Sequence, residues 1–255
     1  MTEPVLIEHR DNVAIVTLNA PEKRNALGLA LYRGLSQTLT TLQDDPSIRA
    51  LVLYGGKHFC AGGDLSALDA SPLAMREAMH IGHRAVRALV GGRLPAVAAV
   101  SGSAFGAGFS LAMACDFVIG DSTTTLCAAF GKVGLTPDYG LMWTLPQRIG
   151  IGRARELLML CKQVGAEEAL SMNLLDRLIA PGATLDAAVS LAKELAAAPP
   201  GTIATTKAML SRSPLSLDTM LAWEADTQSL LARTRDLAEG IRAFAERRPP
   251  SFRGE

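Results

Sequence analysis

The chain has 255 residues, and its 25 lysine and arginine residues balance its 25 aspartate and glutamate residues. Because no basic excess is present to neutralise phosphates, we expect no nucleic-acid partner. The hydrophobic content of 49% fits one large core or wide interfaces between subunits.

Strand and helix patterns alternate up to about residue 180, and helical patterns dominate afterwards. Alternating or short apolar runs predict strands at residues 5–9, 13–18, 50–54, 96–100 and 116–120. Helical spacing predicts helices at residues 29–42, 72–90, 106–115, 152–161, 166–171, 185–197, 201–211 and 217–247. This order predicts an α/β core with a C-terminal helical layer. Residues 247–255, rich in Pro, Arg and Gly, are typical of a mobile tail.

The sequence predicts a cytoplasmic protein. No apolar run reaches about 18 residues, so we expect no membrane span. The first residues lack the charged and apolar regions of a signal peptide. The four cysteines show no C-x-x-C spacing, and most of them sit in apolar stretches that are typical of small core residues. We therefore expect a reducing compartment.

Two glycine-rich loops share one design. Residues 55–64 follow a predicted strand and lead toward a helix, and residues 101–108 follow a strand and run directly into a helix. Glycines let the backbone approach a ligand closely, and N–H groups at a helix start can bind a developing oxyanion. The alternative is that these glycines serve only tight turns and close packing. Neither loop has the spacing of a dinucleotide or phosphate loop.

The motifs resemble those of the crotonase (enoyl-CoA hydratase/isomerase) superfamily across nearly the whole chain. The matching segments are residues 21–27, 59–65, 95–108, 111–116, 134–138, 145–146, 150–154 and 246–252. The resemblance implies a spiral of ββα repeats over residues 1–195. It also implies a C-terminal helical region over residues 196–255 that covers the pocket and forms a homotrimer or a dimer of trimers.

The resemblance also places the site. The two oxyanion-hole amides of the family fall on Gly63 and Ala107. Coenzyme A, which enters as part of the acyl-CoA substrate rather than as a cofactor, is expected along two segments. The residues expected to bind it are Lys23, Arg24, Ala26, Ala61, Asp64 and Leu65, and Asp64 is expected to fix its loop or to contact coenzyme A rather than to act as a base.

The hydratases of this superfamily use two glutamates, and the matching positions here are Ser110 and Phe130. Neither side chain accepts a proton from water near neutral pH. We therefore argue against ordinary hydration of an enoyl-CoA. Ser110 is either a hydrogen-bond donor in the pocket or a small residue for helix packing, and Phe130 would exclude water.

One carboxylate, that of Asp138, lies at a position where related enzymes carry a catalytic group. Asp138 matches the position at which several Δ3-Δ2-enoyl-CoA isomerases of the superfamily carry a catalytic carboxylate. A single carboxylate can move a proton between C2 and C4 while two N–H groups hold the enolate oxygen. The alternative is that Asp138 is only a helix N-cap or turn residue. The preferred function is therefore a Δ3-Δ2-enoyl-CoA isomerase.

Three rivals remain. In 4-chlorobenzoyl-CoA dehalogenases an aspartate matching Asp138 is the nucleophile, and their essential histidine maps to His83, but their tryptophan falls on Phe130. A thioester-hydrolysing member and a non-catalytic acyl-CoA-binding member are the other two. His80 and His83 lack a third ligand and have Arg84 beside them, so we expect no metal site.

Overall fold

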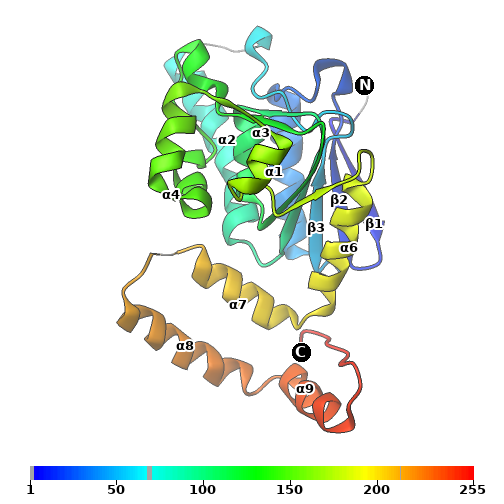
Figure 1. The fold of residues 1–255 in the computed structure, drawn as a ribbon. Coiled ribbons are helices and arrows are strands. Elements are labelled where there is room, and N and C mark those ends of the chain that lie inside the picture. The colour runs from blue at the N-terminus through cyan, green and yellow to red at the C-terminus, as the bar shows by residue number, and fades with distance from the viewer. Residues whose placement is uncertain (1–2, 68–70, 213) are drawn as a thin grey trace.

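The computed structural model describes residues 3–67, 71–212 and 214–255. A six-stranded sheet forms its centre (Figure 1). The antiparallel pair at one edge is a hairpin, and the other strands pair in parallel. In spatial order the strands are β1 (Val5–Arg10), β2 (Val13–Leu18), β3 (Ala50–Tyr54), β4 (Ala96–Val100), β6 (Phe117–Asp121) and β9 (Arg177–Ile179).

Both faces of this sheet are covered, which explains why its central strands read as continuous apolar runs. Side chains alternate between the faces, so Ala14 and Val16 join the larger core cluster while Val13 and Ile15 join the smaller one. The larger cluster lies under α1 (Leu29–Asp44), α2 (Pro72–Gly91), α3 (Ala107–Ala114) and α4 (Leu141–Leu160). The smaller cluster lies under α6 (Thr184–Ala197).

A second, smaller sheet positions the site. It contains three short strands, which are β5 (Ser103–Phe105), β7 (Thr125–Cys127) and β8 (Gln163–Gly165). Two single bridges extend the same pairing, Cys60 with Ala104 and Leu27 with Gly63. Each turn of the chain thus gives one long strand to the first sheet, one short segment to the second, and then a helix. This is the predicted ββα spiral.

Several predicted boundaries were wrong. The three-residue strands β5, β7, β8 and β9 are too short to show alternation, and none was predicted. The predicted helix 217–247 is two helices, α8 (Leu217–Leu231) and α9 (Arg235–Glu246). The break falls at Thr234, whose hydroxyl accepts from the Leu237 N–H at 3.2 Å as an N-cap. The predicted helix 152–161 begins earlier, at Leu141, and α4 is kinked at Gly150.

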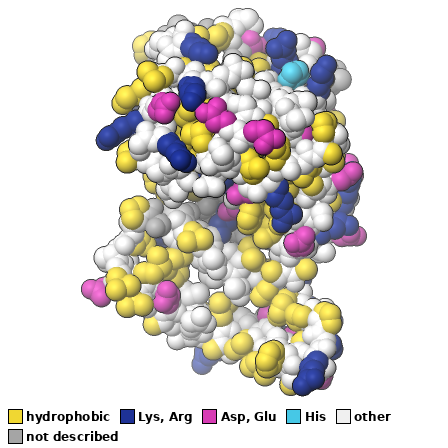
Figure 2. Space-filling model, viewed as in Figure 1, with side chains coloured by type: hydrophobic (Ala, Val, Ile, Leu, Met, Phe, Trp, Pro, Cys, Tyr) yellow, Lys and Arg dark blue, Asp and Glu magenta, His cyan; other side chains and the backbone are white. Residues whose placement is uncertain are grey.

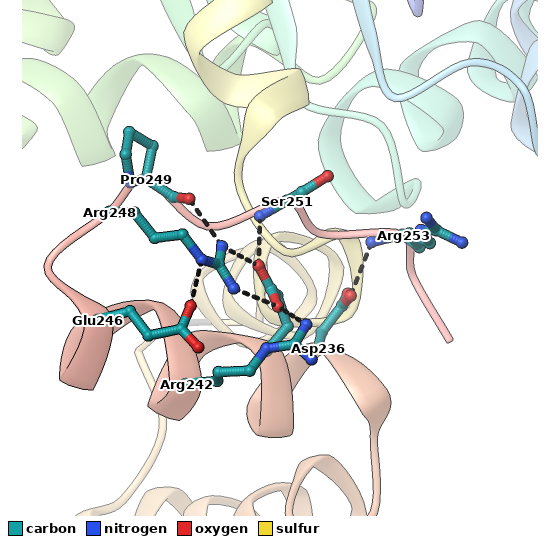
Figure 3. A network of polar contacts seen from close by, with 8 residues as sticks. Asp236, Arg242, Glu246, Arg248, Pro249, Ser251 and Arg253 are labelled. Carbon is teal, nitrogen blue, oxygen red and sulfur yellow. Dashed lines mark hydrogen bonds and ion pairs between the residues drawn. The ribbon is translucent and has the colours of Figure 1, made fainter.

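The predicted mobile tail is ordered, which corrects the expectation for residues 247–255. Figure 3 shows how carboxylates of α9 hold it. Glu239 accepts from Arg248 at 2.7 Å and from the Ser251 N–H at 3.0 Å. Asp236 accepts from the Arg253 N–H at 2.7 Å. The pKa of Glu239 is held well below its usual range by its arginine partners. Local composition did not reveal these bonds because their acceptors lie in the preceding helix.

The C-terminal helices lie apart from the sheet (Figure 1). The next helix after α6, α7 (Pro200–Leu210), contacts α2, whereas α8 has no buried residue. Figure 2 shows apolar side chains gathered over this part of the molecule. The exposed large apolar residues there include Leu210, Leu217, Leu230, Ile241 and Phe244. The division at residue 195 and the trimeric assembly stay predictions. No helix within the described ranges is long and apolar enough to cross a membrane.

One buried lysine ties α7 to the core. The Lys207 ammonium donates to the Leu94 carbonyl at 2.8 Å and to the Asp116 carboxylate at 2.5 Å. Only 5% of its side chain is exposed. Asp116 also accepts from the Ala96 N–H at 2.7 Å. The pair therefore connects α7 with the start of β4 and with the residue before β6.

We predict that Lys207→Ala lowers the free energy of unfolding by about 2–4 kcal/mol, because a buried acceptor and a carboxylate lose their donor. Chemical denaturation measures this loss. The matched control is Lys193→Ala, which breaks an ion pair with Asp11 whose side chains are 49% and 74% exposed. That change should stay within about 0.5 kcal/mol. Equal effects of the two substitutions would contradict the anchoring role.

Candidate active site

The two predicted glycine loops lie side by side because residues within them pair as part of the second sheet. The Cys60 N–H donates to the Ser103 carbonyl at 3.0 Å, and the Phe105 N–H donates to the Cys60 carbonyl at 2.9 Å. A Cβ at Gly62, where φ is +102°, would lie 2.9 Å from the Phe105 oxygen and 3.7 Å from the Gly106 Cα. Only glycine permits this close backbone approach.

Each loop presents an N–H group without an acceptor among the described residues. Leu27 pairs with the atoms on either side of Gly63, at 2.7 Å to the Gly62 carbonyl and 3.1 Å to the Asp64 N–H, and the Gly63 N–H is left unbonded. Ala107 is the first residue of α3, where N–H groups have no intrahelical partner. Gly63 is exposed and Ala107 is 2% exposed, so these two backbone donors lie in neighbouring loops, one at the surface and one buried. Their role as an oxyanion hole stays a prediction.

A buried asparagine fixes the first loop from beneath. The Asn25 amide, 1% exposed, donates to the Gly55 carbonyl at 2.7 Å and to the His58 carbonyl at 2.8 Å. The Cys60 thiol donates to the Asn25 carbonyl at 3.0 Å and accepts from the Gly62 N–H. Burial raises the pKa of Cys60 to about 12, so it stays a neutral donor. Sequence analysis did not single out Asn25 within its motif.

The two segments expected to hold coenzyme A are adjacent. The Ala61 N–H donates to the Arg24 carbonyl at 2.9 Å, and the Lys23 ammonium contacts the Asp64 carboxylate at 2.7 Å. Asp64 also accepts from the hydroxyl and N–H of Ser66. These hydrogen bonds, first from Lys23 and then from Ser66, lower the pKa of Asp64 to about 2. Asp64 is thus an ionised residue that fixes its loop.

The remaining cations at this edge are Arg24 and Lys57, both exposed. The pKa of His58 is lowered by its burial and then by the charges of these two residues. Neither side chain has an ion-pair partner within the described ranges, so both can meet a phosphate-bearing ligand, and Lys57 was missed by sequence analysis. Ala26 is half-buried and Leu65 is exposed beside them.

Asp138 carries an unpaired buried carboxylate oxygen. It lies in the turn before α4, where Tyr139 and Gly140 both have positive φ. The N-cap position of α4 is Gly140 and no side chain caps it, so Asp138 is not the N-cap. The turn alternative stays open, because the Asp138 carbonyl accepts from the Leu141 N–H at 3.1 Å. The Oδ1 of Asp138 has no hydrogen-bond partner among the described residues. Burial raises the pKa of Asp138 to about 7.

Two tyrosines connect Asp138 to the first glycine loop. Tyr139 is 1% exposed and occupies a notch left by Gly82, where a Cβ would lie 2.4 Å from the tyrosine ring. Its ring stacks on that of Tyr32 at 5.7 Å between centroids. The Tyr32 hydroxyl lies 3.8 Å from a Cβ built at Gly63. The pKa of Tyr32 is raised by burial and then by the negative charge of Asp138. No motif marked either tyrosine.

The positions expected to matter for hydration carry no carboxylate. Ser110 is fully buried, and its hydroxyl donates to the Gly106 carbonyl of its own helix at 3.3 Å. The Phe130 ring lies 3.9 Å from a Cβ built at Gly106. His83 is half-buried, and its pKa is lowered by burial and then by Arg87 and His80. His83 makes no contribution to the pKa shift of Asp138.

The known proteins that this chain resembles are named as acyl-CoA hydratases and isomerases. A family model described as "Enoyl-CoA hydratase/isomerase" matches residues 8–255. The "1,2-epoxyphenylacetyl-CoA isomerase" of Escherichia coli (strain K12) is 34% identical and covers 100% of both chains. The "Crotonyl-CoA hydratase" of Syntrophomonas wolfei subsp. wolfei is 30% identical over 98% of each chain. The solved structure of an enoyl-CoA hydratase from Mycobacterium tuberculosis H37Rv has a TM-score of 0.91, with 33% identity and 100% coverage of both chains. That of an enoyl-CoA hydratase from Bacillus anthracis has a TM-score of 0.94, with 28% identity and coverage of 99% and 100%.

The raised pKa of Asp138 predicts a pH-dependent stability. The folded state binds this proton more tightly than the unfolded chain, whose carboxyl titrates near 3.8. Stability should therefore fall as pH rises from about 4 to about 7 and then level off. We predict that Asp138→Asn unfolds at the same denaturant concentration as the wild type near pH 4 but is more stable by about 4 kcal/mol at pH 8. A constant difference across this range would contradict the shift.

Proposed function

The chain belongs to the enoyl-CoA hydratase/isomerase family, and on that premise we propose that it is a Δ3-Δ2-enoyl-CoA isomerase. The observation that carries the proposal is the buried Oδ1 oxygen of Asp138, which has no hydrogen-bond partner among the described residues, together with a pKa that burial raises to about 7. A carboxylate with such a pKa can accept and return a proton near neutral pH. The names of the relatives include both an isomerase and hydratases, so the family alone leaves the reaction open.

The proposed reaction needs one proton carrier and two backbone donors. The carboxylate of Asp138 removes a proton from C2 of a 3-enoyl thioester, and the electrons move onto the thioester oxygen. The N–H groups of Gly63 and Ala107 hold that oxygen, where the dienolate charge collects. The protonated Asp138 then returns the same proton to C4. The product is a 2-enoyl thioester, and no atom is gained or lost.

Hydration would need further groups that these positions do not supply. Adding water requires one group to deprotonate it and a donor for the remaining carbon. The Ser110 hydroxyl is already bonded to its own helix, and Phe130 presents a hydrocarbon ring beside Gly106. An apolar ring also keeps water from the dienolate and keeps the carboxylate of Asp138 basic.

The proposal extends to the ligand and the assembly. Coenzyme A enters with the substrate, near Arg24 and Lys57, and no further cofactor is needed for a proton shift. We also propose a homotrimer or a dimer of trimers, because α8 and α9 expose apolar residues that a second copy would cover. A cytoplasmic location is part of the same proposal.

We predict that the purified protein converts 3-hexenoyl-CoA to trans-2-hexenoyl-CoA, and that Asp138→Asn abolishes this conversion. Because the ionised form is the base, kcat/KM should fall as pH drops below about 7. The absorbance of the conjugated thioester follows the reaction. The same assay with crotonyl-CoA should show negligible hydration.

The outcomes separate the alternatives. Release of free coenzyme A or of halide from 4-chlorobenzoyl-CoA, abolished by Asp138→Asn, would favour a hydrolase or a dehalogenase. Binding of acyl-CoA without any turnover would favour a non-catalytic member. Robust crotonyl-CoA hydration would overturn the argument from Ser110 and Phe130.

The close contact of the two loops gives a further prediction. A Cβ at Gly108 would lie 2.4 Å from the Cys60 carbonyl oxygen, so Gly108→Ala must push the loops apart. We expect turnover to fall about 100-fold, because the two N–H donors lose their alignment. The matched control is Gly152→Ala in α4, where a Cβ meets no atom within 4 Å. That variant should keep full activity and gain about 0.5–1 kcal/mol in stability. Unchanged turnover in folded Gly108→Ala protein would contradict the model.

A further inference from the structure

The thiol of Cys60 lies between the two glycine loops and takes no part in the proposed reaction. The residue is 0% exposed. Its sulfur donates to the Asn25 carbonyl at 3.0 Å and accepts from the Gly62 N–H at 3.4 Å. Because burial raises the pKa of this thiol to about 12, it stays protonated and serves as donor and acceptor at once. The thiol therefore joins two backbone segments.

Gly62 needs such a restraint, because glycine has more backbone freedom than any other residue. Its φ of +102° is one that residues with a side chain rarely adopt. The Cys60 sulfur holds its N–H group, and its carbonyl accepts from the Leu27 N–H at 2.7 Å. Hydrogen bonds on both sides of Gly62 thus fix its φ and ψ angles.

These bonds set the direction of the Gly63 N–H. The peptide unit that joins Gly62 to Gly63 is planar, and in the trans form its N–H points opposite to its carbonyl. Because this carbonyl points at the Leu27 N–H, the Gly63 N–H points away from Leu27. A rotation about Gly62 would turn that donor out of the proposed oxyanion hole.

The same cysteine also ties the first loop to the second. Its N–H donates to the Ser103 carbonyl, and its carbonyl accepts from the Phe105 N–H. A Cβ at Gly108 would lie 2.7 Å from the Cys60 Cβ, so the cysteine packs directly against the first turn of α3. The Ala107 N–H belongs to that turn. Cys60 therefore contacts the backbone segments that carry both donors.

We propose that Cys60 is a positioning residue, whose thiol orients the Gly63 N–H and keeps it aligned with the Ala107 N–H. The inference deepens the proposed function and rests on it only for the assignment of these two donors. It does not depend on Asp138 or on which bond of the acyl group reacts. Donor alignment matters most when charge develops on the oxygen, so the thiol affects the enolate more than the bound substrate.

The variants Cys60→Ala and Cys60→Ser separate hydrogen bonding from packing. Alanine removes both bonds of the sulfur, whereas serine keeps a donor and an acceptor at the same position. For a role in packing alone, serine would be no better than alanine, because it buries a smaller and more polar group. Should Cys60→Ala unfold, Cys60→Val serves as the variant without a hydrogen-bonding atom.

The thioester carbonyl itself reports the alignment of the donors. Hexanoyl-CoA has no double bond to move, and isotope-edited infrared difference spectroscopy gives the carbonyl stretching frequency of its bound form. We expect wild type to lower this frequency relative to free hexanoyl-CoA, because two N–H donors polarise the carbonyl. Cys60→Ala should lose about half of this shift and Cys60→Ser should keep most of it, while the affinity for hexanoyl-CoA changes less than about threefold.

Turnover of 3-hexenoyl-CoA gives a second readout. We expect kcat of Cys60→Ala to fall about tenfold with KM changed less than about threefold, and Cys60→Ser to recover most of the loss. The matched control is Cys115→Ala, which removes another buried thiol that donates to the Leu111 carbonyl at 3.5 Å, at the end of α3 away from the loops. It should leave the carbonyl frequency and kcat unchanged.

The outcomes decide between the roles. Equal losses in Cys60→Ala and Cys60→Ser would assign Cys60 a packing role and overturn the proposal. An unchanged carbonyl frequency in folded Cys60→Ala would overturn it too, as would a wild type that does not shift the carbonyl. Failure of the isomerase proposal shows separately, as absent conversion of 3-hexenoyl-CoA by a wild type whose carbonyl shift still depends on the thiol.

Discussion

The arrangement of the site depends on the pairing of two short segments in the second sheet. Cys60 bridges Ala104, and this bridge brings the Gly62 backbone against the Phe105 carbonyl. Each segment then ends on an N–H group with no acceptor among the described residues. Their separation is set by main-chain hydrogen bonds rather than by side-chain rotamers, so the geometry is rigid. Asn25 and the Cys60 thiol strengthen this pairing from below.

Residues next to these two loops adopt arrangements that cost free energy. One carboxylate oxygen of Asp138 is buried with no hydrogen-bond partner among the described residues, and Tyr139 beside it holds a left-handed backbone that non-glycine residues rarely adopt. Such features cluster at functional sites because the surrounding structure holds them in place. Here the constraint is the fit of Tyr139 against Gly82 and its stacking on Tyr32. The packing of Tyr139 against residues of α1 and α2 thus holds the neighbouring Asp138 in place, although burial disfavours its ionised carboxylate.

The sequence predicted the parts that rest on local signals. The glycine loops and the long strands were visible as patterns, and the likeness to solved structures confirms the predicted fold. The choice of Gly63 and Ala107 within the loops came from the family resemblance, and their role stays a prediction. Only the structure could test the N-cap alternative for Asp138, because the sequence around an N-cap aspartate looks the same as that around an aspartate with an unpaired oxygen. The stacking of Tyr32 on Tyr139 could not be predicted, since the two residues lie far apart in the chain.

The proposed oxyanion hole would consist of main-chain donors alone, and this has a consequence for how such proteins diversify. No side-chain replacement at Ser110, Phe130 or Asp138 removes the N–H of Gly63 or Ala107. Thioester recognition can therefore be inherited unchanged while the rim of the site mutates from one chemistry to another. Intermediates along such a route would still bind their ligand, so selection has a bound complex on which to act. This separation accounts for one scaffold carrying both isomerase and hydratase names among its relatives.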